Sequence, residues 1–165
     1  MSATTATRSA LSQTSVWAST LARLILAGVL LAAGLLKVVD PAGSVAAVRA
    51  YELVSSPLAT PIGWGLPFLE IGLGLLLLVG LHTRAAAIVS AFLLVTLLAA
   101  VISVAARGLS IDCGCFGGGG PVASGETRYT SEIVRDIGLL LLSAWLAWRP
   151  RTRFSLDRWD GEHLG

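Results

Sequence analysis

Apolar residues gather in four long stretches along the chain, and the charged and polar residues are concentrated between them. A helix that crosses a lipid bilayer needs about 20 mainly apolar residues, because each residue advances the helix by about 1.5 Å. The pattern therefore predicts an all-α integral membrane protein built as a four-helix bundle. The expected spans are Val16–Leu36, Ile62–Leu81, Arg84–Ala106 and Ser131–Trp148.

The polar flanks predict one membrane domain, residues 16–148, between two tails. The first 15 residues are rich in Ser, Thr and Ala, so we expect 1–15 to be a disordered cytoplasmic tail and 149–165 a basic one. The first apolar stretch is longer than the core of a signal peptide, and it is therefore expected to stay in the membrane. Arg23 lies near the start of this span and is expected to snorkel to the lipid headgroups.

The connections between the expected spans differ in length. His82–Thr83 is a very short turn, which makes the second and third spans antiparallel neighbours. The first loop is longer, and Pro41–Val54 within it predicts a short helix with proline in its first turn. Its apolar residues recur at three-residue steps, a spacing that favours an interfacial helix on the membrane surface. These residues are Val45, Val48, Tyr51 and Val54.

Composition supports lipid as the solvent, since 55% of the residues are hydrophobic and only 13% are charged. A soluble domain of this length needs more polar surface to cover its core. The net charge of +2 and the lack of a basic stripe argue against nucleic-acid binding. Glycines inside the spans are expected to allow close contacts between helices. These glycines are Gly28, Gly34, Gly72, Gly74 and Gly80.

Lysines and arginines near the ends of the spans predict the orientation of the chain. With four spans, both termini and the turn at His82 lie on one side of the membrane. That side has more basic residues, so both termini are expected in the cytoplasm and the loop at 107–130 outside it. The termini side carries Arg8, Arg23, Arg84, Arg149, Arg151, Arg153 and Arg158; the other side carries Lys37, Arg49, Arg107, Arg128 and Arg135.

The loop at 107–130 contains the only two cysteines, Cys113 and Cys115. The single residue between them, Gly114, permits backbone angles that other residues resist. A disulfide closing so small a ring would be strained, and strain makes a disulfide more reducible and a better oxidant. Outside the cytoplasm, such a dithiol suits thiol–disulfide exchange with a partner protein.

Three other interpretations of the two cysteines remain open: a static structural disulfide, a fragment of a metal site and two inert thiols. A metal site needs about four ligands, and the loop offers two sulfurs without a histidine. The two histidines, His82 and His163, are expected on the opposite side of the membrane. No metal site is therefore predicted.

Glu70 is a carboxylate inside the second span, about 12 Å from its outer end. A charge at this depth normally faces the interior of the bundle and has a partner. By depth, Arg135 is the expected counter-ion, and Asp136 is expected to pair with Lys37 or Arg107. We interpret the Glu70 pair first as structural; the alternative is that Glu70 exchanges protons with the thiols.

The order of four short motifs resembles DoxX-type membrane proteins, and the cysteine motif narrows the resemblance to the MauE branch, named for methylamine utilisation. The resemblance covers roughly Leu21 to Trp148. The motifs are Gly34-Leu-Leu-Lys-Val-Val-Asp-Pro41, Leu66-Pro-Phe-Leu-Glu70, Asp112-Cys-Gly-Cys-Phe-Gly117 and Val134-Arg-Asp136.

The resemblance implies a bacterial inner-membrane protein that works beside a thioredoxin-like partner outside the cytoplasm. MauE-type proteins are associated with the maturation of methylamine dehydrogenase, whose small subunit is rich in disulfides. By motif match, the candidate functional positions are Lys37, Glu70, Cys113, Cys115 and Arg135.

We therefore expect a membrane redox-assistance protein that exchanges thiols and disulfides between its cysteine pair and this partner. Its client would be methylamine dehydrogenase or another disulfide-containing protein. One cysteine pair cannot relay electrons across a membrane alone, so a quinone or a second protein is also required. The alternatives are a quinone-coupled thiol oxidoreductase and a non-catalytic scaffold for a partner complex. The direction of electron flow and the oligomeric state stay open.

Overall fold

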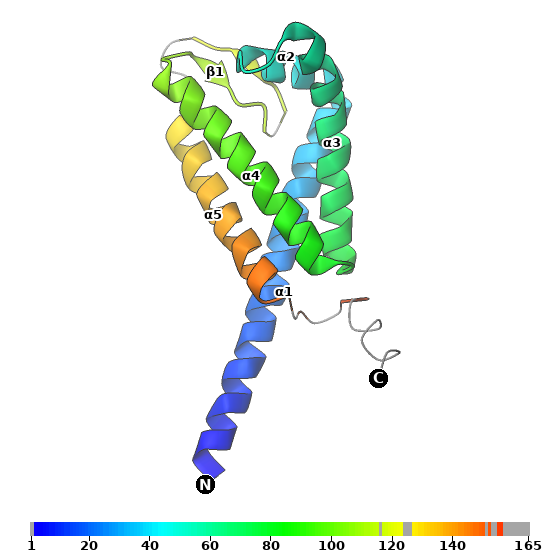
Figure 1. Ribbon diagram of the computed structural model, residues 1–165, viewed down its shortest axis with the longest axis vertical. Coiled ribbons are helices and arrows are strands. Elements are labelled where there is room, and N and C mark those ends of the chain that lie inside the picture. The colour runs from blue at the N-terminus through cyan, green and yellow to red at the C-terminus, as the bar shows by residue number, and fades with distance from the viewer. Residues whose placement is uncertain (1, 116, 124–126, 151, 153–154, 157–165) are drawn as a thin grey trace.

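The computed structural model describes residues 2–115, 117–123, 127–150, 152 and 155–156, with the backbone alone for residues 2–12. These residues form five α-helices and two short β-strands (Figure 1). The long helices are α1 (Ser2–Val39), α3 (Ser56–Val79), α4 (Thr83–Ala106) and α5 (Tyr129–Trp148). The short elements are α2 (Pro41–Ala50), β1 (Ile111–Asp112) and β2 (Gly120–Pro121).

Three helices in the described part of the chain are long and apolar enough to cross a membrane, which confirms a helical membrane protein. They are Gln13–Val39, Ser56–Val79 and Thr83–Ala106. Large apolar side chains face outward on these helices, as lipid contact requires; Phe92 is 74% exposed. The fourth expected span, α5, does not belong to this set. Its first two turns carry Glu132, Arg135 and Asp136, which leave no long stretch with few charges.

The long helices pack in two pairs, α1 with α3 and α4 with α5, and α1 also contacts α5. Apolar side chains from all four helices, including Leu26, Leu77, Leu94 and Leu146, fill the space between them. The short turn after α3 places α3 beside α4, as predicted. Gly80 ends α3 with a φ of 73°, a left-handed conformation that glycine adopts readily. Figure 1 shows α3 and α4 meeting at this turn and separating toward their other ends.

The α1–α3 pair depends on two glycines that let the helices approach closely. A methyl group added at Gly74 would lie 2.7 Å from the Leu31 side chain, and one added at Gly34 would also clash with α3. Gly28 and Gly72, for which the same role is predicted, have nothing within 4 Å of the added methyl group. Close helix contact therefore explains Gly34 and Gly74 but not the other two.

The short helix α2 begins as predicted but ends earlier. Pro41 stands in its first turn, and the Asp40 side chain accepts a hydrogen bond from the Gly43 backbone N–H at 2.9 Å. The helix stops at Ala50 instead of Val54, because the backbone turns into a left-handed conformation two residues later, with a φ of 51°.

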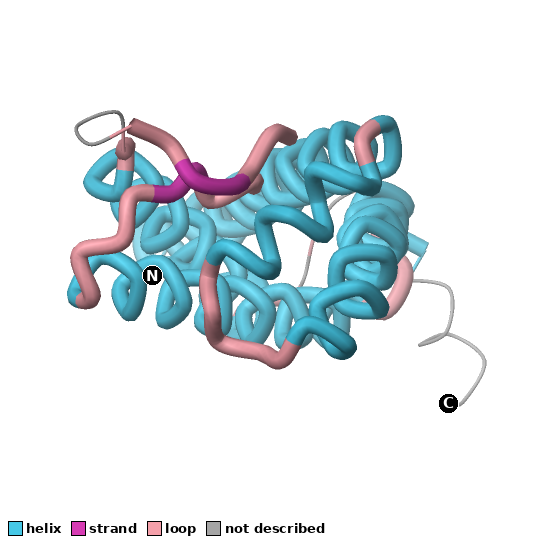
Figure 2. Tube along the Cα trace, turned by 90° about the horizontal axis from the view of Figure 1, so that it is seen from above, coloured by secondary structure: helices cyan, strands magenta, loops and turns pink. Residues whose placement is uncertain are grey.

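The apolar side of α2 contacts protein instead of lipid. Val45 and Tyr51 are each 8% exposed, and the Ser44 hydroxyl donates a hydrogen bond to the Gly63 carbonyl of α3 at 2.8 Å. Two members of the three-residue repeat, Val45 and Tyr51, therefore pack against the protein and do not face lipid. Figure 2 shows α2 and the strands lying across the ends of the long helices.

Two further expectations at the opposite end need correction. Helix α1 extends back to Ser2, so residues 2–15 are helical instead of disordered; no glycine or proline precedes Gly28 to interrupt the helix. Arg23 does not snorkel, since it is 2% exposed. Ser155 lies against this end of the bundle, where its hydroxyl donates to the Gly80 carbonyl at 2.6 Å. The remainder of the expected tail 149–165 lies mostly outside the described residues.

We predict that Gly74→Ala lowers the free energy of unfolding by about 1–3 kcal/mol, because the added methyl group forces α1 away from α3. Gly72→Ala is the matched control on the same helix. It should be neutral or stabilising, since alanine favours a helix over glycine by up to about 1 kcal/mol. Unfolding of both variants in the same detergent, followed by circular dichroism, measures the difference. Equal stability of the two variants would contradict close packing at Gly74.

Candidate functional site

The two cysteines lie in the connection between β1 and β2, within the segment 109–123 that we call the cysteine loop. The strands pair antiparallel, with Ile111 opposite Pro121. Gly114 and Gly119 have φ values of 68° and 113°, conformations that favour glycine. A side chain on Gly114 would lie 2.6 Å from the Ala47 Cβ of α2. The glycines thus let the cysteine loop lie directly on α2.

The only two tyrosines of the chain both anchor the cysteine loop. The Tyr51 hydroxyl donates to the Cys113 carbonyl at 3.3 Å. The Tyr129 hydroxyl donates to the Leu109 carbonyl at 2.6 Å and accepts from the Ile111 backbone N–H at 3.0 Å. Burial raises the pKa of Tyr51 well above its usual range, so its phenol stays protonated and remains a donor.

Both cysteines are buried thiols, each 8% exposed, and neither is in a disulfide. The Cys115 backbone N–H donates to the Cys113 sulfur at 3.4 Å. They belong to an apolar cluster with Tyr51 and Ile111, so an incoming thiol does not reach them freely from the outer surface. The glycines around the two cysteines therefore do not leave the sulfurs open in this conformation.

The surroundings of the two thiols shift their pKa values in opposite directions. A hydrogen bond from the Cys113 thiol lowers the pKa of Cys115, and the positive charges of Lys37 and Arg135 lower it further. The same hydrogen bond, together with burial, raises the pKa of Cys113. Cys115 is thus the thiol that ionises first, and Cys113 remains protonated beside it.

Lys37, in the last turn of α1, is the counter-ion of Glu70. Its Nζ donates to Glu70 Oε1 at 2.5 Å, and both side chains are buried. The expectation that Arg135 pairs with Glu70 is wrong, because α1 and not α5 packs along α3. Glu70 Oε2 is buried with no hydrogen-bond partner among the described residues. Lys37 thus has two roles: it neutralises the Glu70 carboxylate, and its positive charge lowers the pKa of Cys115.

Arg135 and Asp136 pair with each other near the start of α5. Arg135 Nε donates to Asp136 Oδ1 at 2.9 Å, and Nη2 lies 2.9 Å from the same oxygen. The sequence pattern predicts that Asp136 pairs with Lys37 or Arg107. This prediction is wrong, because Asp136 pairs with Arg135. Arg107 instead donates to the Tyr51 carbonyl at 2.5 Å, which ties the end of α4 to the end of α2.

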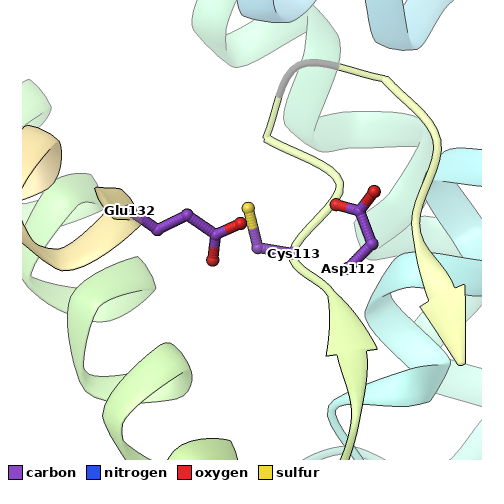
Figure 3. Close-up of side chains that lie close together, drawn as sticks. All are labelled: Asp112, Cys113 and Glu132. Carbon is purple, nitrogen blue, oxygen red and sulfur yellow. The ribbon is translucent and has the colours of Figure 1, made fainter. Parts of the chain in front are cut away.

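Glu132 is a neighbour of the thiols that the sequence analysis misses. Its carboxylate, the Cys113 sulfur and the Asp112 carboxylate lie within 4.8 Å of one another (Figure 3). Glu132 comes from α5, four residues before Asp136, and this one-turn spacing on a helix is the signal that could have placed it beside the cysteine loop. Its negative charge contributes to the raised pKa of Cys113. The prediction of no metal site counted ligands in the loop alone and did not consider Glu132.

A cavity of about 720 Å³ lies between α2, α3, α4 and the cysteine loop. Most of its lining is apolar, and its lining also includes Lys37, Cys113 and Cys115. The structure therefore brings four of the six predicted site residues together at this cavity. Lys37, Cys113 and Cys115 line it, and Glu70 is paired with Lys37. Arg135 and Asp136 approach Cys115 from α5.

Three long apolar helices and a buried dithiol fixed across their ends define a helical membrane protein with a candidate redox site. A family model described as methylamine utilisation protein MauE matches residues 15–149, so the chain belongs to the MauE family of methylamine utilisation. The match includes every predicted site residue. No curated protein and no solved structure matches the chain. The wider resemblance to DoxX-type proteins stays a prediction.

We predict that Arg135→Gln makes Cys115 less reactive toward iodoacetamide. The substitution removes a positive charge and leaves the Asp136 carboxylate nearby, and both effects raise the pKa of Cys115. Less thiolate is then present at pH 7, so alkylation should slow by about two- to tenfold and its pH midpoint should move upward. Mass spectrometry of the modified peptide measures the rate at each cysteine.

The matched control is Arg128→Gln. Arg128 caps the same helix, and its charge is not among those that shift the pKa of either cysteine. It should leave the pH profile unchanged. An Arg135→Gln profile that coincides with the control would show that Arg135 does not stabilise the Cys115 thiolate.

Proposed function

We propose that this MauE-family protein is a membrane thiol–disulfide exchange component that oxidises a thioredoxin-like partner outside the cytoplasm. The observation that carries the proposal is the geometry of two adjacent thiols: the Cys115 backbone N–H donates to the Cys113 sulfur at 3.4 Å, and both cysteines line one cavity with Lys37. The hydrogen bond between the two thiols lowers the pKa of Cys115 and raises that of Cys113. A stabilised thiolate favours the reduced form of the pair, and a pair whose reduced form is stabilised is a strong oxidant when it is a disulfide.

The proposed exchange moves two electrons from the partner to the cysteine loop. A partner thiolate attacks the Cys113 sulfur of the Cys113–Cys115 disulfide, and Cys115 leaves as a thiolate because the thiol of lower pKa leaves faster. The second partner thiol then attacks the partner sulfur of the mixed disulfide. Cys113 is released and takes a proton, and the partner leaves as a disulfide.

Burial of the cysteines sets a condition on this exchange. Because each is 8% exposed, the partner must displace part of the cysteine loop before its thiolate reaches Cys113. The turn at the cysteines is rich in glycine, which permits other backbone conformations, and the hydrogen bond from Tyr51 to the Cys113 carbonyl is a contact that the partner would have to break. The client of the partner would be methylamine dehydrogenase or another disulfide-containing protein.

A growth experiment tests whether the thiols are needed. In a deletion strain grown on methylamine, the wild-type protein should restore growth, and the Cys113→Ser, Cys115→Ser double variant should not. Serine keeps the size of each side chain, so equal amounts of both proteins in the membrane fraction serve as the control. Full restoration of growth by the double variant would contradict the redox proposal and favour a non-catalytic scaffold.

The exchange also requires that the cysteine loop lies outside the cytoplasm, and we propose a four-helix bundle in the bacterial inner membrane with both termini cytoplasmic. Helix α5 is the fourth span in this arrangement, since it runs alongside α4 (Figure 1). It also presents exposed apolar side chains along its length: Val134, Ile137, Leu141 and Trp148. Helix α2 then lies at the outer membrane interface.

Single cysteines introduced into the Cys113→Ser, Cys115→Ser background test this topology. Ser56 is the first residue of α3 and His82 follows its other end, and both residues are exposed. A membrane-impermeant maleimide should label the Ser56→Cys variant in intact spheroplasts and the His82→Cys variant only after lysis. The reverse result would place the cysteine loop in the cytoplasm, where exchange with an extracytoplasmic partner is impossible.

A further inference from the structure

We propose that the cavity beside the cysteine loop binds a membrane quinone, and that this quinone reoxidises Cys113 and Cys115. The inference rests on the proposed function, because it names the acceptor of the electrons that the thiols receive from the partner. Three features of the cavity carry it: its access to lipid, its size with an apolar lining, and the chemistry of its polar lining residues.

The cavity reaches the surface that faces lipid. Ile62 of α3 and Val95 of α4 both line the cavity, and they are also 41% and 48% exposed. Both residues lie on helices that are long and apolar enough to cross a membrane. The opening is therefore between α3 and α4, where these helices separate, and a lipid-soluble molecule enters it without passing through water.

The size and lining of the cavity fit an isoprenoid quinone. Its volume of about 720 Å³ lies within the range of about 300–1,000 Å³ that is typical of small-molecule sites. Leu66, Leu93 and Leu97 are among the apolar side chains of the wall. These would surround an aromatic ring and the first isoprene units, while the rest of the tail extends into lipid.

The polar and nucleophilic groups of the lining favour an electrophile with carbonyl oxygens over a lipid acyl chain. Lys37 has three N–H donors, and its bond to Glu70 accounts for one of them. Ser44 and Tyr51 also line the cavity, but their hydroxyls donate to backbone carbonyls. Lys37 is thus the group suited to donate a hydrogen bond to a quinone oxygen, beside the nucleophilic Cys115.

The reaction balances as two thiols plus one quinone giving one disulfide plus one quinol. The Cys115 thiolate adds to a ring carbon, a C–S bond forms, and the electron pair moves to a quinone oxygen that takes a proton from water. Cys113 transfers its proton to the Glu132 carboxylate, which lies within 4.8 Å of its sulfur, and attacks the Cys115 sulfur. The S–S bond forms, the C–S bond breaks, the quinol takes its second proton from water, and Glu132 releases its proton to water.

The test uses the full-length protein in lipid nanodiscs, reduced with dithiothreitol and then separated from it. Decylubiquinone or a short-chain naphthoquinone is added, quinol formation is followed by absorbance, and the remaining thiols are counted by maleimide gel shift. We expect one quinol for each pair of thiols lost, and the more reactive of the two quinones identifies the headgroup class. In a parallel assay, reduced thioredoxin transfers electrons to the oxidised protein.

Val95→Trp fills the mouth of the cavity, and Ile102→Trp is its matched control. Ile102 lies on the same helix, is 50% exposed and does not line the cavity. Val95→Trp should slow quinol formation at least tenfold and leave the exchange with thioredoxin unchanged, whereas Ile102→Trp should change neither. Equal quinol formation in the two variants would overturn the assignment of the quinone to this cavity.

The two assays separate the failure of this inference from that of the proposed function. If the protein exchanges with thioredoxin but forms quinol from neither quinone, the quinone site is overturned and the exchange function stands. A lipid acyl chain would then be the occupant of the cavity. The absence of both reactions in the wild-type protein would overturn both proposals.

Discussion

The buried ion pair between Lys37 and Glu70 is the interaction on which the rest of the site depends. A carboxylate inside an apolar helix is tolerated only when a partner neutralises it, and removing one member of a buried pair costs about 3–5 kcal/mol. The close approach of α1 and α3 at Gly34 and Gly74 holds these two side chains in contact. Because Lys37 also lines the cavity beside Cys115, the pair that joins two helices also supplies positive charge to the thiols.

The cysteine loop has little structure of its own and takes its conformation from the helix ends around it. Its two-residue strands pair with each other, while Tyr51 after α2 and Tyr129 at the start of α5 bind its backbone. Two charges from different helices, Lys37 of α1 and Arg135 of α5, meet near Cys115. The difference between the two thiols is therefore a property of the whole outer end of the protein, although the thiols themselves are separated by one residue.

The helices could be predicted from the sequence, because apolar stretches of this length have few alternatives to a helix in lipid. The charge pairs could not. Depth along the helices makes Arg135 as good a partner for Glu70 as Lys37, and only the packing of α1 along α3 decides between them. Glu132 was missed for a related reason, since its position beside Cys113 depends on how α5 lies against the cysteine loop. The burial of the thiols likewise follows from three-dimensional packing that residue types do not reveal.

The walls of the cavity come from both pairs of long helices. Helix α3 belongs to the pair that contains the buried ion pair, and α4 belongs to the pair with α5. At the opposite end, the turn at Gly80 joins α3 to α4, and the hydrogen bond from Ser155 closes over that turn. Helices α3 and α4 thus converge at this turn and diverge toward the cysteine loop (Figure 1). The angle between them sets the width of the cavity, while the Lys37–Glu70 contact, which joins α1 to α3, does not depend on it.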